Sequence, residues 1–248
     1  MYITDAVKVI APLDLILFRG VDLISRVVEV AERKEIGCDR FSHVGIIVNS
    51  EILPSIRELE PGKFYIWEST STDKKDPVVD VEDGKHHFGV QIRPLEDAVK
   101  IYTSVEGGTV TWGQLKDNPW NDIKKKVEII GILDKVHADF GRRTYEANFL
   151  SLLAVVFPRL RRIRDLVDTT CIDSYKLFTS WKTDSLIGPP NVPIAGWLFC
   201  SELIAIIYQN LGILSKDYDA RNMAPVDFIG SRPPYSNLTK DLIDITSV

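Results

Sequence analysis

Residues 197–212 read WLFCSELIAIIYQNLG, and they follow a stretch that is rich in proline and glycine. Apolar residues at positions 203, 206, 207, 211 and 214 recur with a helical period, and Gly212 is typical of a helix end. This stretch therefore predicts a helix that begins at Cys200 and carries one apolar face.

The place of Cys200 at the start of this helix has a chemical consequence. A helix N-terminus is the positive end of the peptide dipole, which favours a thiolate over a thiol. The thiolate is the form that attacks a carbonyl carbon. Cys200 is therefore a candidate nucleophile. The alternative is a small buried core residue, since Cys200 shares a helix face with Leu203 and Ile207.

Two strand-like runs upstream, 42–48 and 63–69, contain the partners that such a nucleophile needs. His43 is the candidate base, and Glu68 is the candidate carboxylate that orients the imidazole. The two side chains can lie side by side if the strands pair antiparallel, and Gly45 would leave open space on the face of His43. The alternatives are a core histidine and a surface carboxylate.

The remaining chain predicts a mixture of helices and strands, and the expected fold class is α+β. Strands are expected at 13–18 and 90–93, helices at 21–33 and 95–102, and a short strand or turn at 224–229. Residues 1–248 are expected to form a single domain. Because residues from about 120 to 175 are helix-like, we expect a mostly helical insertion from 101 to 190 within it.

Composition argues against several classes of function. A net charge of -5 and a pI near 5.5 give no support for nucleic-acid binding. No apolar stretch reaches the roughly 18 residues that span a bilayer, and the N-terminus does not resemble a secretory signal. Three cysteines without a CxxC pair favour a reducing compartment. We therefore expect a cytoplasmic protein.

The histidines and one arginine-rich segment bear on metals and membranes. The four histidines lack HExxH or Cys/His ligand spacing, and the adjacent residues His86 and His87 rarely face one ion, so no metal and no cofactor is expected. Residues 149–157 are apolar and are followed by several arginines. This pattern suits either an anionic membrane surface or a helix buried on one side.

The order of the motifs along the chain resembles a known superfamily. The motifs are Asp14-Leu15-Ile16-Leu17-Phe18, Ser42-His43-Val44-Gly45, Trp67-Glu68-Ser69, Val90-Gln91-Ile92-Arg93-Pro94-Leu95, Phe199-Cys200-Ser201-Glu202-Leu203 and Ala224-Pro225-Val226-Asp227-Phe228. Together they resemble the circularly permuted branch of the NlpC/P60 papain-like superfamily, especially the YiiX-like hydrolases with their poxvirus relatives. The resemblance covers roughly residues 12–95 and 197–230. Leu13 stands where that family usually has glycine.

The resemblance implies a permuted papain-like fold, in which a small antiparallel, barrel-like sheet packs on the cysteine helix. It implies Cys200 as nucleophile, His43 as base and Glu68 as the third member. Residues 143–146 resemble the family's Tyr-Asp element, which makes Tyr145 a candidate substrate-binding residue.

The implied activity is that of a cysteine hydrolase or acyltransferase. It would act on a peptide, amide or lipid-ester carbonyl through a thioester acyl-enzyme. The alternatives are a catalytically inactive papain-like binding module for a peptide or lipid ligand, and a redox-sensing thiol protein.

Overall fold

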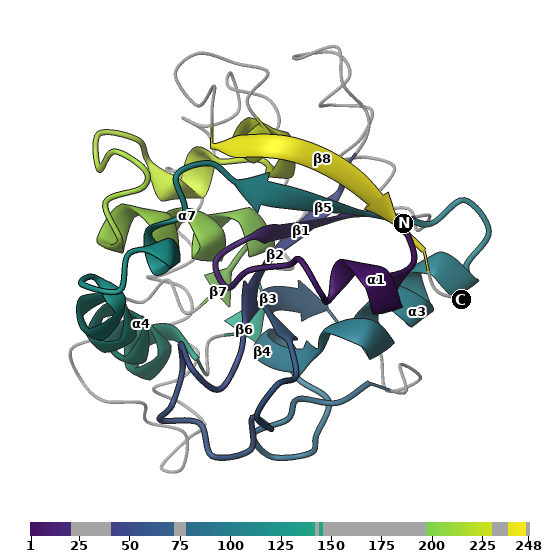
Figure 1. The fold of residues 1–248 in the computed structure, drawn as a ribbon. Helices are drawn as coiled ribbons and strands as arrows, with labels where there is room; N and C mark the ends of the chain where they lie inside the picture. The colour runs from purple at the N-terminus through teal and green to yellow at the C-terminus, as the bar shows by residue number, and fades with distance from the viewer. Residues whose placement is uncertain (21–40, 72–77, 142–143, 146–196, 230–237, 247–248) are drawn as a thin grey trace, which may run out of the picture.

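The structure is a computed structural model that describes residues 1–20, 41–71, 78–141, 144–145, 197–229 and 238–246. Within these ranges the fold is α+β, as expected, and its strands form one mostly antiparallel sheet (Figure 1). The strand order is β7-β6-β4-β3-β2-β1-β5-β8, and the short pair β6 and β7 is parallel. The strands are β1 Leu15–Arg19, β2 His43–Val48, β3 Tyr65–Ser71, β4 Phe88–Pro94, β5 Thr109–Leu115, β6 Thr144–Tyr145, β7 Trp197–Leu198 and β8 Thr239–Ile245.

Helices cover both faces of the sheet (Figure 1). The α-helices are α1 Ile3–Ala6, α3 Leu95–Ser104, α4 Lys126–Phe140 and α7 Cys200–Asn210, and the 3-10 helices are η1 Pro119–Asn121, η3 Ala220–Asn222 and η4 Pro225–Ile229. One apolar core lies between the sheet and the helices α4 and α7, and a second lies under α1 and α3. Because both faces are covered, the central strand β2 is buried along its whole length.

The cysteine helix α7 forms where the sequence predicts it. Phe199 before it has an extended backbone, and its N–H donates to the Glu202 carboxylate at 3.5 Å. Ser201 Oγ donates to the backbone oxygen of Met223 at 2.6 Å, which ties the first turn to the η3–η4 segment. After the helix, Gly212 adopts a φ of +71°, a left-handed conformation that favours glycine and ends the helix.

The turn before β1 has a backbone conformation that is unusual for its residue. Leu13 is fully buried and has a φ of +74°, in the left-handed region. The next residue, Asp14, accepts hydrogen bonds from the Ala11 and Leu115 N–H groups and from the Trp112 indole. Asp14 therefore organises the entry into β1, as a turn residue would.

The predicted elements that fall on described residues are present, with some differences. The segment 224–229 contains no strand, and Pro225–Ile229 within it form the 3-10 helix η4, which fits the turn alternative. The first part of the expected helical insertion at 101–190 is not all helical. It contains the strand β5, which pairs with both β1 and β8 inside the sheet. Helix α4 fits the helical expectation, whereas 142–143, 146–190 and the predicted helix at 21–33 lie outside the described residues.

Two further observations concern the ends of the chain and its longer helices. Tyr2 forms a parallel bridge with Thr246, and the amino group of Met1 donates to the Asp244 carbonyl at 2.8 Å. The first and last described segments therefore lie side by side (Figure 1). Of the helices that the structure describes, none has both the length and the apolar character to cross a membrane.

Candidate active site

The structure brings Cys200, His43 and Glu68 together. His43 Nε2 lies 2.5 Å from Glu68 Oε2, and the His43 ring lies close enough to the Cys200 thiol for each group to change the pKa of the other. The three residues are 5%, 7% and 0% exposed. Because Nε2 faces the carboxylate, Nδ1 is the nitrogen that remains for proton exchange with the thiol.

Strand pairing explains how the cysteine reaches the sheet. β2 and β3 run antiparallel, and their pairing extends from Val48↔Tyr65 to Ile46↔Trp67. Beyond that point α7 packs against β2, and the N–H groups of Val44 and Ser201 help to lower the pKa of the Cys200 thiol. The start of α7 thus lies against β2 at the residue next to His43.

Gly45 has a different role from the one its sequence position suggests. Continuing the register by one residue places it opposite Glu68. A Cβ on Gly45 would lie 2.5 Å from two side-chain carbons of Ile66 and 3.2 Å from the Cβ of Glu68. The expectation of open space on this face is therefore wrong, because Ile66 fills it. Glycine is needed here so that β3 can bring Glu68 close to β2.

Arg93 is a fourth member of the site, and it was not singled out from the sequence. It is 1% exposed, its Nε donates to Glu68 Oε1 at 2.6 Å, and its Nη2 lies 2.5 Å from the same oxygen. The β3–β4 register pairs Ile66 with Arg93 and Glu68 with Gln91, so Arg93 shares the face of Glu68. The alternation of apolar Val90 and Ile92 with polar Gln91 and Arg93 was the available signal.

Each oxygen of Glu68 therefore has its own partner, His43 or Arg93. Burial alone would raise the pKa of the Glu68 carboxyl, but the Arg93 guanidinium and the His43 ring outweigh it and lower the pKa to about 2. Glu68 is consequently a carboxylate throughout the physiological range. A fixed negative charge beside Nε2 stabilises a protonated imidazole.

The electrostatics of Cys200 and His43 favour an ion pair. Burial would raise the pKa of the Cys200 thiol, yet His43 and the N–H groups of Val44 and Ser201 bring it below its ordinary value. Burial would lower the pKa of His43, yet interactions with Tyr102, Cys200 and Glu68 raise it well above its ordinary value. Both changes in pKa favour a pair in which the thiol is a thiolate and the imidazole an imidazolium.

Aromatic rings hold the imidazole of His43 in place. The Phe18 ring centroid lies 5.4 Å from the His43 ring, and Tyr102 of α3 stacks nearly parallel to it at 6.3 Å. Phe18 stands opposite His43 in the β1–β2 register. Tyr102 was not singled out from the sequence, because only the tertiary structure brings α3 to this end of β2.

The structure places the backbone of Tyr145 near the same region. It belongs to β6, which lies beside β4 and pairs with β7 in the register Tyr145↔Leu198, two residues before Cys200. A role for Tyr145 in substrate binding stays a prediction.

The sequence matches no protein-family model, and a search of the curated proteins finds no match. The functional assignment of Cys200, His43, Glu68 and Arg93 therefore depends on the arrangement of these four residues, together with the motif resemblance.

Proposed function

We propose that this chain is a papain-like thiol hydrolase or acyltransferase that acts on an amide or ester carbonyl. The observation that carries the proposal is the continuous contact from Cys200 through His43 to Glu68, in which the thiol pKa is lowered and the imidazole pKa is raised. In a buried cysteine with a purely structural role, apolar surroundings would raise the thiol pKa. The lowered pKa of Cys200 therefore favours a nucleophile over a core residue.

The proposed reaction has two stages. The Cys200 thiolate attacks the carbonyl carbon, and a tetrahedral intermediate forms with negative charge on the former carbonyl oxygen. His43 Nδ1 gives its proton to the leaving amine or alcohol as the carbon–heteroatom bond breaks, which leaves a thioester on Cys200 and a neutral imidazole. Water or another acceptor then loses a proton to His43 and attacks the thioester, which releases the product and restores the thiolate.

The Glu68 carboxylate and the backbone N–H of Cys200 support this reaction without gaining or losing a proton. Glu68 stays ionised, fixes the ring through Nε2 and stabilises the imidazolium. The first N–H groups of a helix have no partner inside that helix, so the N–H of Cys200 is the candidate donor to the developing oxyanion. Loss of one such donor typically lowers the rate about 10²- to 10³-fold.

Two features support the permuted papain-like assignment. The cysteine helix packs on a mostly antiparallel sheet, and the strand that carries His43 precedes this helix in the chain. In addition, Leu13 has the left-handed conformation that glycine adopts most easily, at the position where the resembling family has glycine. A barrel-like closure of the sheet remains part of this proposal.

The pH dependence of Cys200 alkylation tests the proposed ion pair. We expect alkylation, mapped to Cys200 by mass spectrometry, to stay fast well below pH 8.5, where an ordinary thiol loses reactivity. In His43→Ala the reactivity should move to higher pH, because burial then dominates the thiol pKa. A short cysteine-containing peptide serves as the reference thiol. A wild-type profile centred near pH 8.5, unchanged in His43→Ala, would refute the ion pair.

Turnover then separates an enzyme from a binding module. A panel of thioester, ester and amide substrates, with short-peptide and fatty-acyl forms, is compared in wild type and Cys200→Ala. The proposal expects release from at least one class that disappears in Cys200→Ala. An activated thiol without turnover, with ligand binding that survives Cys200→Ala, would instead favour the inactive papain-like module for a peptide or lipid.

A further inference from the structure

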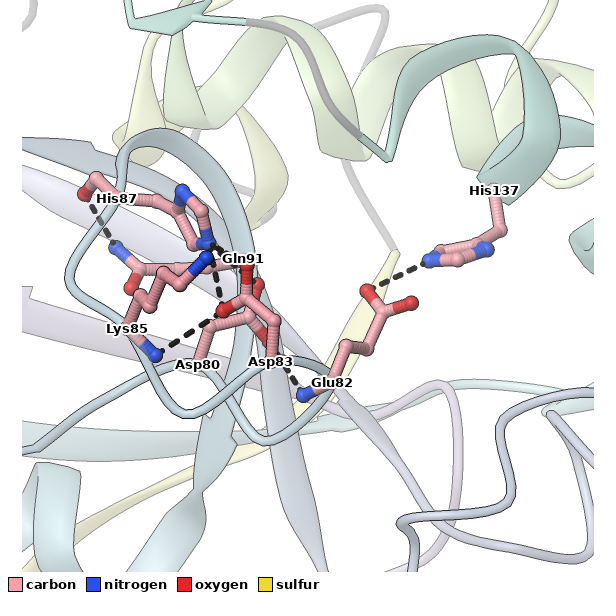
Figure 2. A network of polar contacts seen from close by, with 7 residues as sticks. All are labelled: Asp80, Glu82, Asp83, Lys85, His87, Gln91 and His137. Carbon is pink, nitrogen blue, oxygen red and sulfur yellow. Dashed lines mark hydrogen bonds and ion pairs between the residues drawn. The ribbon is translucent and has the colours of Figure 1, made fainter.

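A second cluster of polar side chains lies outside the catalytic residues, in the segment that leads into β4. Figure 2 shows Asp80, Asp83 and His87 pointing toward one another across a tight loop. Their ligand-type atoms all lie within 4.8 Å of one another. The loop is closed by backbone hydrogen bonds from the Asp80 N–H to the Lys85 carbonyl and from the Gly84 N–H to the Asp80 carbonyl, both at 2.9 Å.

Asp80 is the residue that suggests a ligand. It is fully buried, and its Oδ1 accepts a hydrogen bond from the Glu82 N–H at 3.0 Å. Its Oδ2 is buried and accepts no hydrogen bond from the described residues. The His87 Nε2 lies 3.8 Å from this oxygen, beyond hydrogen-bond distance. A buried carboxylate oxygen without a hydrogen bond is costly, and burial accordingly raises the pKa of Asp80.

Asp83 and His87 supply two further ligand-type atoms close to that oxygen. His87 Nε2 lies 2.9 Å from each oxygen of Asp83, whose Oδ1 also accepts from the Lys85 N–H at 3.0 Å. The side chains of Asp83 and His87 are 25% and 31% exposed, so an ion can enter from solvent. The cluster is thus anchored by a buried carboxylate and open on its outer side.

We propose that Asp80, Asp83 and His87 bind a divalent transition-metal ion of the Zn²⁺ type. Tetrahedral zinc with ligands at about 2.0–2.2 Å separates neighbouring ligand atoms by about 3.3–3.6 Å. The observed separations of 2.9 and 3.8 Å from His87 Nε2 lie on either side of that range, so small side-chain rotations suffice. The imidazole favours zinc over Ca²⁺ and Mg²⁺, which prefer oxygen ligands alone.

The surroundings hold the ligands in position, as metal sites require. Gln91 of β4 donates to the His87 carbonyl at 3.4 Å, and Glu82 pairs with His137 of α4 at 3.0 Å (Figure 2). Because this loop contacts both β4 and α4, a bound ion would fix its position against these two elements. Three protein ligands leave a fourth position for water.

The spacing of the histidines and the adjacency of His86 and His87 predicted no metal. In the structure His87 instead faces two upstream carboxylates, Asp80 and Asp83, and His86 is not part of the cluster. The spacing of the three residues, 80, 83 and 87, matches none of the motifs considered.

Equilibrium dialysis with Zn²⁺ tests the site, in a Cys200→Ser background that removes the catalytic thiol as a competing ligand. We expect one ion per chain, with affinity weakened at least about tenfold by His87→Gln and by Asp80→Asn. The matched control is His86→Gln, which changes the neighbouring exposed histidine and should leave affinity unchanged. Thermal unfolding with and without Zn²⁺ gives a second readout, since binding to the folded state raises Tm.

Three outcomes would overturn the site. They are no ion bound in the Cys200→Ser background, an affinity that His87→Gln leaves unchanged, and tighter binding of Ca²⁺ than of Zn²⁺. If Asp80→Asn fails to fold, the partly exposed His87→Gln still decides the question. These measurements do not depend on turnover, so they stand apart from the proposed hydrolase activity.

Discussion

Replacement of Arg93 by methionine tests whether the buried carboxylate is held by its guanidinium partner. Arg93 and Glu68 are 1% and 0% exposed, so Arg93→Met leaves the Glu68 charge with His43 alone. The pKa of Glu68 is about 2, against an ordinary value of 4.5. That difference is worth about 3 kcal/mol, since each pKa unit is about 1.4 kcal/mol. Breaking a buried ion pair typically costs a similar 3–5 kcal/mol.

The effect of pH on this loss follows from the sign of the pKa change. A carboxyl whose pKa is lowered on folding stabilises the protein above its unfolded-state pKa, and this stabilisation disappears as pH falls through the folded value. The contribution of Glu68 is therefore full at pH 7 and falls between about pH 4.5 and 2. At pH 3 it amounts to about 1–1.5 kcal/mol.

Urea unfolding of wild type and Arg93→Met at pH 7 and pH 3 measures both quantities. We expect a loss of about 3 kcal/mol at pH 7 that at least halves at pH 3. Arg57→Met removes an exposed arginine as a control and should stay within about 0.5 kcal/mol of wild type. Adding Glu68→Gln to Arg93→Met should recover part of the loss, because no buried carboxylate is then left without its arginine partner. Equal losses at the two pH values would refute the reasoning.

Further predictions concern the backbone and the turn before β1, each measured by the free energy of unfolding. Gly45→Ala should lose about 1–3 kcal/mol, since its Cβ would lie 2.5 Å from Ile66, and the displaced Glu68 should also slow Cys200 alkylation at neutral pH. Gly212→Ala should lose about 1 kcal/mol because φ is +71°, and no loss would contradict the left-handed helix end. Asp14→Ala should lose at least about 2 kcal/mol by leaving the buried Leu115 N–H and Trp112 indole without their acceptor; a near-zero effect would show that they find another.

Much of the fold was predictable because it depends on local patterns. The apolar period after Cys200 and the runs around His43 and Glu68 predicted their elements, and these form close to the expected limits. The strand β5 was not predicted: Thr109–Leu115 contains polar residues, a tryptophan and a glycine, and its place between β1 and β8 is set by tertiary pairing.

The residues Cys200, His43 and Glu68 were predictable from the sequence, but the neighbouring side chains that hold them in position were not. Motif order indicated Cys200, His43 and Glu68, whereas no local pattern shows that Arg93 turns its guanidinium toward Glu68. That contact requires the register of β3 against β4. The same limit explains the error at Gly45, since the neighbour that fills its space, Ile66, belongs to another strand.

The bridge between Tyr2 and Thr246 means that the order of the proposed catalytic residues along the chain could change without a change in their spatial arrangement. A short linker could join the segments that contain Tyr2 and Thr246, and new ends could be opened at the turn between α3 and β5, where Val105 and Glu106 are exposed. In that rearranged chain Cys200 would precede His43, the order of ordinary papain-like enzymes, while every strand kept its neighbours. The point at which the chain begins would change, whereas the contacts among Cys200, His43 and Glu68 would not.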